Sequence, residues 1–278
     1  MVNRIIAGTP TNPVESLLCS ILSGPIDIDK MDYLFRDSLH CGVPYGMNFD
    51  APRLINSLCL NESNEGIAIT AKGKTAAEMM VFSRYVMFSE VYWHHTARSF
   101  TAMLQRQVYD SYEDFEWDSA NLVTLTDQNF SERFSQSDGT KKGLLGVRQP
   151  YKRLLDYNAD QNPEIYNSIA HQPYEWLIEI GNRLAQSLTK ECGTDIAPHE
   201  ILVDAPPTGL EVQFKVPIKD GGTFKTLGAI SPVVKALAQK QFDDFVKRVR
   251  LFIHPRHYQM VDASAAEKSL IEVAANTP

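Results

Sequence analysis

The stretch DIDKMDYLFRD, at residues 27–37, carries the densest group of chemically active side chains in the sequence and decides how the first part of the chain is interpreted. Asp29, Tyr33 and Asp37 are spaced four residues apart, so a helix brings them to one face. Apolar residues recur at helical spacing on the other side, and a glycine soon after supplies a terminator. The stretch therefore predicts a helix over residues 27–39 with one polar face.

This face offers groups that suit a metal ion, a sugar and a phosphate. The Asp29 carboxylate can hold a metal, the Tyr33 phenol can stack on or bond to a sugar, and the Asp37 carboxylate can accept a hydroxyl hydrogen. Lys30, one step round the helix, can meet phosphate oxygens. The face is thus a candidate binding surface.

A simpler interpretation of the same stretch is a solvated helix face that carries charge pairs. Asp32 and Arg36 have the four-residue spacing that such a pair needs. Composition alone favours this interpretation, because charged helix faces are common and short motifs are weak evidence.

Helices also dominate the rest of the first half. Asn12-Pro13 starts a short helix that Gly24-Pro25 ends. Short β-type runs at 58–60 and 67–70 flank a polar turn and predict a hairpin. Neither proline nor glycine occurs between residues 75 and 108, and apolar residues recur there at helical spacing, which predicts one long helix.

The second half mixes helices with a small sheet. A polar, glycine-punctuated segment at 136–143 predicts a loop. Beyond it the patterns predict helices over 163–191 and 231–246, strands over 201–203, 210–216 and 249–253, and a final helix from Val261.

Composition excludes several classes of protein. Hydrophobic residues make up 44% and charged residues 22% of 278, which is typical of globular proteins. The net charge of -7 argues against a surface built to neutralise nucleic acid. Four cysteines without a CxxC pair indicate reduced thiols in a cytoplasm, and no apolar run approaches the length of a membrane span, so we expect a cytoplasmic protein without membrane contact.

Several longer strings resemble one family. SGPIDIDKMDYLFRDSLHCGVPYGMNFDAPRLI (23–55), GKTAAEMMVFSRYVMFSEVYWHHTARSFTAML (73–104) and LVTLTDQNF (122–130) are similar to parts of HD-domain deoxynucleoside triphosphate triphosphohydrolases. EILVDAPP, ISPVVKAL and KRVRLFIHP look like the C-terminal portion of the bacterial, dGTP-hydrolysing members, whereas residues 105–200 are only loosely similar. The resemblance covers the C-terminal two thirds of such an enzyme.

The resemblance implies roles for the residues of the 27–37 stretch. Asp29 corresponds to the last metal ligand, Lys30 to a phosphate contact, Tyr33 to a residue packed on the deoxyribose, and Asp37 to a contact for the 3′-hydroxyl. These four residues are the best site candidates.

The resemblance also implies that His94, His95 and Arg98 help to hold the triphosphate. The alternative is a helix that turns these side chains to solvent or to a subunit contact. Arg84 has a weaker claim, because a lone arginine on a long helix more often pairs with a nearby carboxylate.

The family assembles its metal site from a histidine, a His-Asp dipeptide and the aspartate matched by Asp29. None of the seven histidines is followed by aspartate, and His40 is interpreted as a helix-end residue rather than a ligand. A catalytic zinc site normally has three protein ligands, so we expect this chain alone to bind no metal tightly and to be inactive. The family's divalent metal, whether Mn, Mg, Fe or Zn, is not identified by the sequence.

The expected fold is mainly α: an incomplete HD-like helical bundle over 1–135, with an α+β region over 136–278. The chain is then a truncated product, half of a split enzyme, or a former hydrolase kept for binding. A missing segment would leave Met31, Leu34 or Phe35 exposed.

The sequence leaves three candidate functions open. The first is a fragment or subunit of an enzyme that hydrolyses deoxynucleoside triphosphates to nucleoside and triphosphate, working as a homo-oligomer or with an N-terminal HD-bearing chain. The second is a non-catalytic nucleotide-binding or oligomerisation protein of the same descent. The third, a nucleic-acid-binding module, rests on the basic segment 247–250, which an amphipathic edge strand explains more simply.

Overall fold

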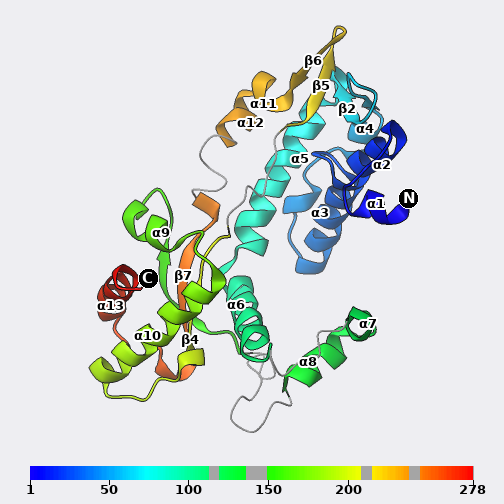
Figure 1. Cartoon of the computed structure of the whole chain (residues 1–278). Helices are drawn as coiled ribbons and strands as arrows, with labels where there is room; N and C mark the ends of the chain where they lie inside the picture. Colours follow the sequence, from blue (N-terminus) through cyan, green and yellow to red (C-terminus); the bar gives the residue numbers. More distant parts are fainter. Residues whose placement is uncertain (113–118, 136–148, 208–214, 238–244, 278) are drawn as a thin grey trace. The chain divides into compact units, whose positions relative to one another are not determined.

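The computed structural model describes residues 1–112, 119–135, 149–207, 215–237 and 245–277, and it forms two compact units (Figure 1). Unit 1 comprises residues 1–93 and 209–246, and unit 2 comprises residues 94–208 and 247–278. Each unit is therefore built from two separate segments of the chain. The predicted boundary at 135/136 and the predicted loop at 136–143 lie outside the described residues.

Unit 1 is mainly helical with one four-stranded sheet. Its helices are α1 (Val2–Ile6), α2 (Pro13–Ser23), α3 (Ile28–Cys41), α4 (Ala51–Ile55), α5 (Lys74–Met87), α11 (Leu227–Ile230) and α12 (Pro232–Ala236), with 3-10 turns at Tyr45–Met47 and Ala71–Gly73 and a π-helical turn at Phe88–Tyr92. Its strands are β1 (Leu58–Leu60), β2 (Ile67–Thr70), β5 (Pro217–Asp220) and β6 (Thr223–Thr226).

Local caps fix the first helices, and the sequence predicts those at Asn12 and Gly42. The Asn12 side chain accepts a hydrogen bond from the Glu15 amide at the start of α2. Asp27 does the same for the Lys30 amide at the start of α3, with a distance of 2.7 Å. Gly42 ends α3 with a φ of 67°, a left-handed conformation that favours glycine.

The sheet of unit 1 joins the two segments of that unit. β1 and β2 form the predicted antiparallel hairpin, β2 pairs in parallel with β5, and β5 pairs antiparallel with β6. The core beneath contains fully buried residues of α3, α4, α5 and the sheet, among them Leu34, Leu54, Ile69, Met87 and Ile218.

The expectation that Leu34 is exposed is therefore wrong, because its side chain is fully buried. Met31 and Phe35 are partly buried in the same core. The apolar residues of α3 that face solvent are Ile28 and Leu39, which are 59% and 70% exposed.

Unit 2 places helices around a three-stranded antiparallel sheet. Its helices are α6 (His95–Asp110), α7 (Ser119–Leu122), α8 (Asp127–Ser135), α9 (Pro163–Ile169), α10 (Tyr174–Cys192) and α13 (Ala263–Ala275), with 3-10 turns at Pro198–Glu200 and Pro255–His257. Its strands are β3 (Lys152–Tyr157), β4 (Ile201–Asp204) and β7 (Val249–Ile253), in the order β3-β7-β4.

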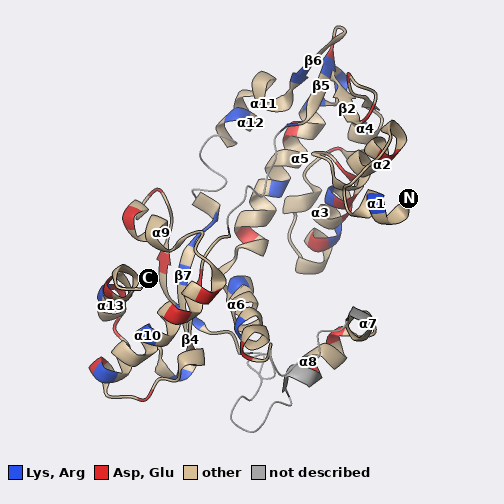
Figure 2. Cartoon of the chain, viewed as in Figure 1, with Lys and Arg blue, Asp and Glu red and all other residues tan. Residues whose placement is uncertain are grey.

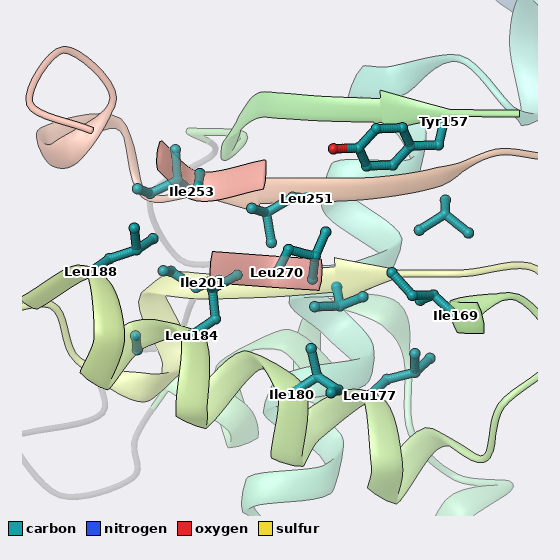
Figure 3. Packing of buried hydrophobic residues seen from close by; sticks show 14 of the residues in the cluster. Tyr157, Ile169, Leu177, Ile180, Leu184, Leu188, Ile201, Leu251, Ile253 and Leu270 are labelled. Atoms are coloured by element: carbon teal, nitrogen blue, oxygen red, sulfur yellow. The ribbon is translucent and has the colours of Figure 1, made fainter. Parts of the chain in front are cut away.

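The core of unit 2 lies between the sheet and helix α10 (Figure 3). Ile180 and Leu184 of α10 and Ile201, Leu251 and Ile253 of the strands are at most 1% exposed. The fold class predicted from the sequence, mainly α with a smaller β portion, is confirmed. Among the described residues, no helix is long and apolar enough to cross a membrane.

Two long predicted helices are interrupted. The helix expected over 75–108 changes to a π-helical turn after Met87 and stops at Trp93, and His94 then caps α6 through its ring nitrogen. The helix expected over 163–191 breaks between α9 and α10, where His171 has a φ of 67° and Pro173 disfavours a helical conformation at the residue before it.

The strand predicted over 249–253 is confirmed as β7, but its predicted position at the edge of the sheet is wrong. β7 is the central strand of its sheet, and all five of its residues are buried. The strand predicted over 210–216 and most of the helix predicted over 231–246 lie outside the described residues, apart from α12.

Candidate functional site

The polar face of α3 forms a hydrogen-bonded cluster with α5 and the π-helical turn. Arg84 donates from Nε to the Tyr33 hydroxyl at 3.1 Å, and its guanidinium carbon lies 5.7 Å from the centre of the Phe88 ring. The Tyr92 hydroxyl donates to Asp37 Oδ2 at 2.8 Å. Two of the predicted sugar contacts are thus held by partners more than forty residues away along the chain.

The two phenols of this cluster also touch each other. The rings of Tyr33 and Tyr92 meet edge to face with their centres 6.1 Å apart. Burial raises the pKa of Tyr33, and burial together with the bond to Asp37 raises the pKa of Tyr92. Both phenols are therefore neutral hydrogen-bonding groups at physiological pH.

Asp29 and Lys30 lie in the first turn of α3. Asp29 is exposed, whereas the Lys30 ammonium is mostly covered, with its side chain 19% exposed. Lys30 Nζ donates to the Gly24 carbonyl at 3.0 Å and to the Asp27 carboxylate. The Asp32–Arg36 pair predicted by the simpler interpretation is present at 3.1 Å with both side chains more than half exposed, on a part of α3 that faces solvent.

The structure places two further residues beside the predicted residues of α3: Arg84, to which the sequence gave only a weak claim, and Tyr92. Arg84 bonds to a phenol of the candidate site, and Tyr92 was not singled out at all. The sequence signal that could have pointed to these residues was the four-residue spacing of Arg84, Phe88 and Tyr92. It is typical of any helix, and so it indicates a site only once the partners on α3 are known.

The remaining predicted residues, His94, His95 and Arg98, belong to unit 2 and start α6. The rings of His94 and His95 have centres 4.2 Å apart. Burial lowers the pKa of His95, and the neighbouring His94 adds to this effect. Arg98 forms a bidentate ion pair with Asp204, with Nε 3.0 Å from Oδ2 and Nη2 2.5 Å from Oδ1.

The ion pair of Arg98 gives that residue a structural task within unit 2. The Asp204 side chain is 1% exposed, so burial raises its pKa and the Arg98 guanidinium opposes that rise. The roles of His94, His95 and Arg98 as phosphate contacts stay predictions.

Two of the three cations in the basic segment 247–250, Lys247 and Arg250, are buried within unit 2. Asp156 of β3 accepts from Arg248 Nη1 at 3.0 Å, from Arg250 Nε at 3.1 Å and from Arg153 Nη1 at 2.9 Å. Figure 2 shows acidic and basic residues interspersed on these strands. A basic surface for nucleic acid therefore finds no support in this segment.

A separate groove lies in unit 1 between the 3-10 turn that precedes α4 and the start of α5. Its volume is about 460 Å³, and its polar lining comes from Asn48, Asp50, Arg53 and Thr75. None of the predicted residues of α3 lines this groove.

The described residues do not assemble a metal site by themselves. No three His, Cys, Asp or Glu side chains in the described parts of the chain gather in a way that could hold a metal ion. Asp29 offers one exposed carboxylate, which falls short of the ligand set that a catalytic metal needs.

Comparisons with known proteins give the family context. A family model described as "HD associated region" matches residues 49–277. An uncharacterized protein of Methanocaldococcus jannaschii is 30% identical over 226 residues, which are 80% of this chain and 48% of that protein. The chain thus spans about half the length of this curated relative.

Two crystal structures share the fold. A hypothetical protein from Aquifex aeolicus is 24% identical with a TM-score of 0.67, over 97% of this chain and 64% of its own. A phosphohydrolase from Bacteroides thetaiotaomicron is 18% identical with a TM-score of 0.61, over 91% of this chain and 66% of its own.

Proposed function

Because this chain belongs to the HD associated region family, whose model covers residues 49–277, we propose that it is the nucleotide-holding part of an HD-type phosphohydrolase. The proposed reaction adds water across the bond between the nucleoside and the triphosphate of a deoxynucleoside triphosphate such as dGTP. The products are the nucleoside and triphosphate.

The observation that carries this proposal is the cluster of Tyr33, Asp37, Arg84 and Tyr92. It combines a phenol and a carboxylate, which suit a sugar ring and its hydroxyl, with a guanidinium, which suits phosphate oxygens. Lys30 lies one turn before Tyr33 and supplies a second cation. The order along α3 is therefore metal ligand, phosphate contact, then sugar contacts.

The described residues do not supply a complete set of ligands for the metal. We propose that Asp29 is its last ligand and that a histidine and a His-Asp pair come from a further segment, either upstream in the same polypeptide or in a partner chain. Divalent metals prefer such mixed imidazole and carboxylate sets.

A second candidate is a nucleotide-binding or oligomerisation protein of the same family without hydrolysis. The single carboxylate at Asp29, without two further ligands among the described residues, favours it. It predicts the same affinity for a deoxynucleotide but no dependence on a metal.

Reconstitution separates the two candidates. The chain is combined with the HD-bearing segment of a longer relative, and release of triphosphate from each of the four deoxynucleoside triphosphates is measured with and without divalent metal. Metal-dependent release that Asp29→Ala abolishes supports the hydrolase. Association and metal binding without any release contradict it and favour the second candidate.

A further inference from the structure

The Lys30 ammonium has two of its hydrogen-bond donors already in use. It donates to the carbonyl of Gly24 at 3.0 Å and to the carboxylate of Asp27. An ammonium group has three N–H donors in a tetrahedral arrangement. Fixing two of them fixes the direction of the third, which is left for a ligand.

Both acceptors are themselves held in place. Asp27 is 2% exposed, and its two oxygens have separate tasks, because Oδ1 accepts from the Lys30 amide at 2.7 Å while Oδ2 accepts from the Lys30 ammonium. The same carboxylate thus caps the first turn of α3 and holds the ammonium group of Lys30.

The Gly24 carbonyl is fixed by the close passage of the chain past the end of α2. A Cβ atom at position 24 would lie 2.3 Å from the carbonyl oxygen of Ser20, so only glycine fits here. The backbone between Gly24 and Asp27 therefore forms a rigid holder for the lysine ammonium.

A cap alone does not explain the choice of aspartate. Serine, threonine or asparagine accepts the amide hydrogen bond at this position equally well. A buried carboxylate costs free energy unless its charge is compensated, and Lys30 supplies that compensation. The second oxygen of Asp27 is thus the feature that needs an explanation beyond capping.

We propose that Asp27, with the Gly24 carbonyl, is a positioning residue that aims the Lys30 ammonium at a phosphate oxygen of the bound nucleotide. This inference rests on the proposed function, in which Lys30 contacts the phosphate. A lysine held in this way loses less side-chain freedom on binding than a free one, which raises affinity.

The test uses the full 278-residue chain and calorimetric titration with dGTP in the absence of metal. Lys30→Met, which removes the charge, should weaken binding about tenfold. Asp27→Asn keeps the cap and removes the acceptor for the ammonium, and it should weaken binding about fivefold through lost positioning. Asp27→Ser, whose short hydroxyl caps but does not reach the ammonium, is the second variant and should behave alike.

The double variant is the decisive measurement. If Asp27 acts through Lys30, Asp27→Asn adds nothing in the Lys30→Met background, whereas a general structural effect is additive. Thermal unfolding checks the fold: Asp27→Asn keeps the cap but loses the ion pair with Lys30, so its unfolding transition should keep the shape of the parent's with a lowered midpoint.

The outcomes that contradict the two proposals differ. A parent chain that does not bind dGTP, or Lys30→Met that binds as the parent does, overturns the proposed phosphate role of Lys30 and this inference with it. If Asp27→Asn binds dGTP as tightly as the parent or more tightly, the positioning role alone is overturned. This result is expected if the carboxylate only repels phosphate. Losses of dGTP affinity that add up in the double variant also overturn the positioning role alone.

Discussion

The Tyr92 hydroxyl donates a hydrogen bond of 2.8 Å to Oδ2 of Asp37 and so ties the π-helical turn after α5 to the last turns of α3. π-helical turns occur often at functional sites, because the inserted residue redirects the side chains around it. Here the turn contains the phenol that reaches the candidate sugar contact.

Replacing Tyr92 with phenylalanine should test this bond directly. The change removes one hydrogen bond to a charged group and leaves the edge contact with Tyr33, so we expect a loss of about 2 kcal/mol in the free energy of unfolding. Urea unfolding measures it. Tyr109→Phe, at a 40% exposed residue of α6, is the control and should change little. An equal loss in both variants contradicts a special role for the Tyr92 hydroxyl.

The Asp29 carboxylate should be required for metal binding only in the reconstituted protein. With the HD-bearing segment added, Asp29→Asn should lower both bound metal and triphosphate release by more than about tenfold, since a lost ligand weakens a metal site strongly. Metal content by mass spectrometry and product release are measured together. Asp32→Asn, on the exposed part of the same helix, is the matched control. Full activity in Asp29→Asn excludes the assigned ligand role.

Asp156 should be one of the most sensitive positions of unit 2. Asp156→Ala leaves the Arg250 guanidinium, whose side chain is 5% exposed, without its ion-pair partner on β3, and we expect a loss of about 3 kcal/mol. Arg153→Ala removes a partner that is 44% exposed and should cost less than about 1 kcal/mol. Chemical denaturation followed by circular dichroism compares the two. Similar losses of stability in the two variants would show that the exposure of a side chain does not determine how much its ion pair contributes to this network.

Acid should loosen the contact between α1 and α2. Hydrogen bonds from Arg4, followed by the Thr11 amide, lower the pKa of Glu15 from 4.5 to about 2. A carboxyl with a lowered folded pKa stabilises the fold above 4.5 and loses that contribution as pH falls from 4.5 towards 2. The protection factors of the α1 amides, which are corrected for the pH dependence of the intrinsic exchange rate, should therefore fall over this window in the parent. Glu15→Gln should exchange faster already at pH 6 and show no such transition, and a transition that persists in this variant would assign it to another group.

Local sequence signals predicted the parts of the fold that local physics determines. Asn12 and Gly42 mark helix ends because each acts on backbone groups within a few residues of itself. The β1–β2 hairpin follows from its polar turn for the same reason. The face shared by Asp29, Tyr33 and Asp37 needs only the helical repeat.

Long-range partners were beyond such signals. The alternation around Arg250 is the same in an edge strand and in a central strand, and only the pairing of β7 with both β3 and β4 decides between them. The continuous pattern from residue 75 to 108 likewise hides the π-helical turn, since a change of helix type leaves the apolar spacing nearly intact. Arg84 and Tyr92 joined the candidate site for the same reason, through partners on α3.

The parallel pairing of β2 with β5 has a consequence for synthesis on the ribosome. Ile69 pairs with Ile218, so the sheet of unit 1 stays incomplete until all of residues 94–208 have emerged, followed by β5. During that interval β2 presents an unpaired edge, and such edges are the places where nascent chains associate wrongly. Slower translation after residue 70 should therefore lower the soluble yield, whereas a slowdown after residue 226 should leave it unchanged.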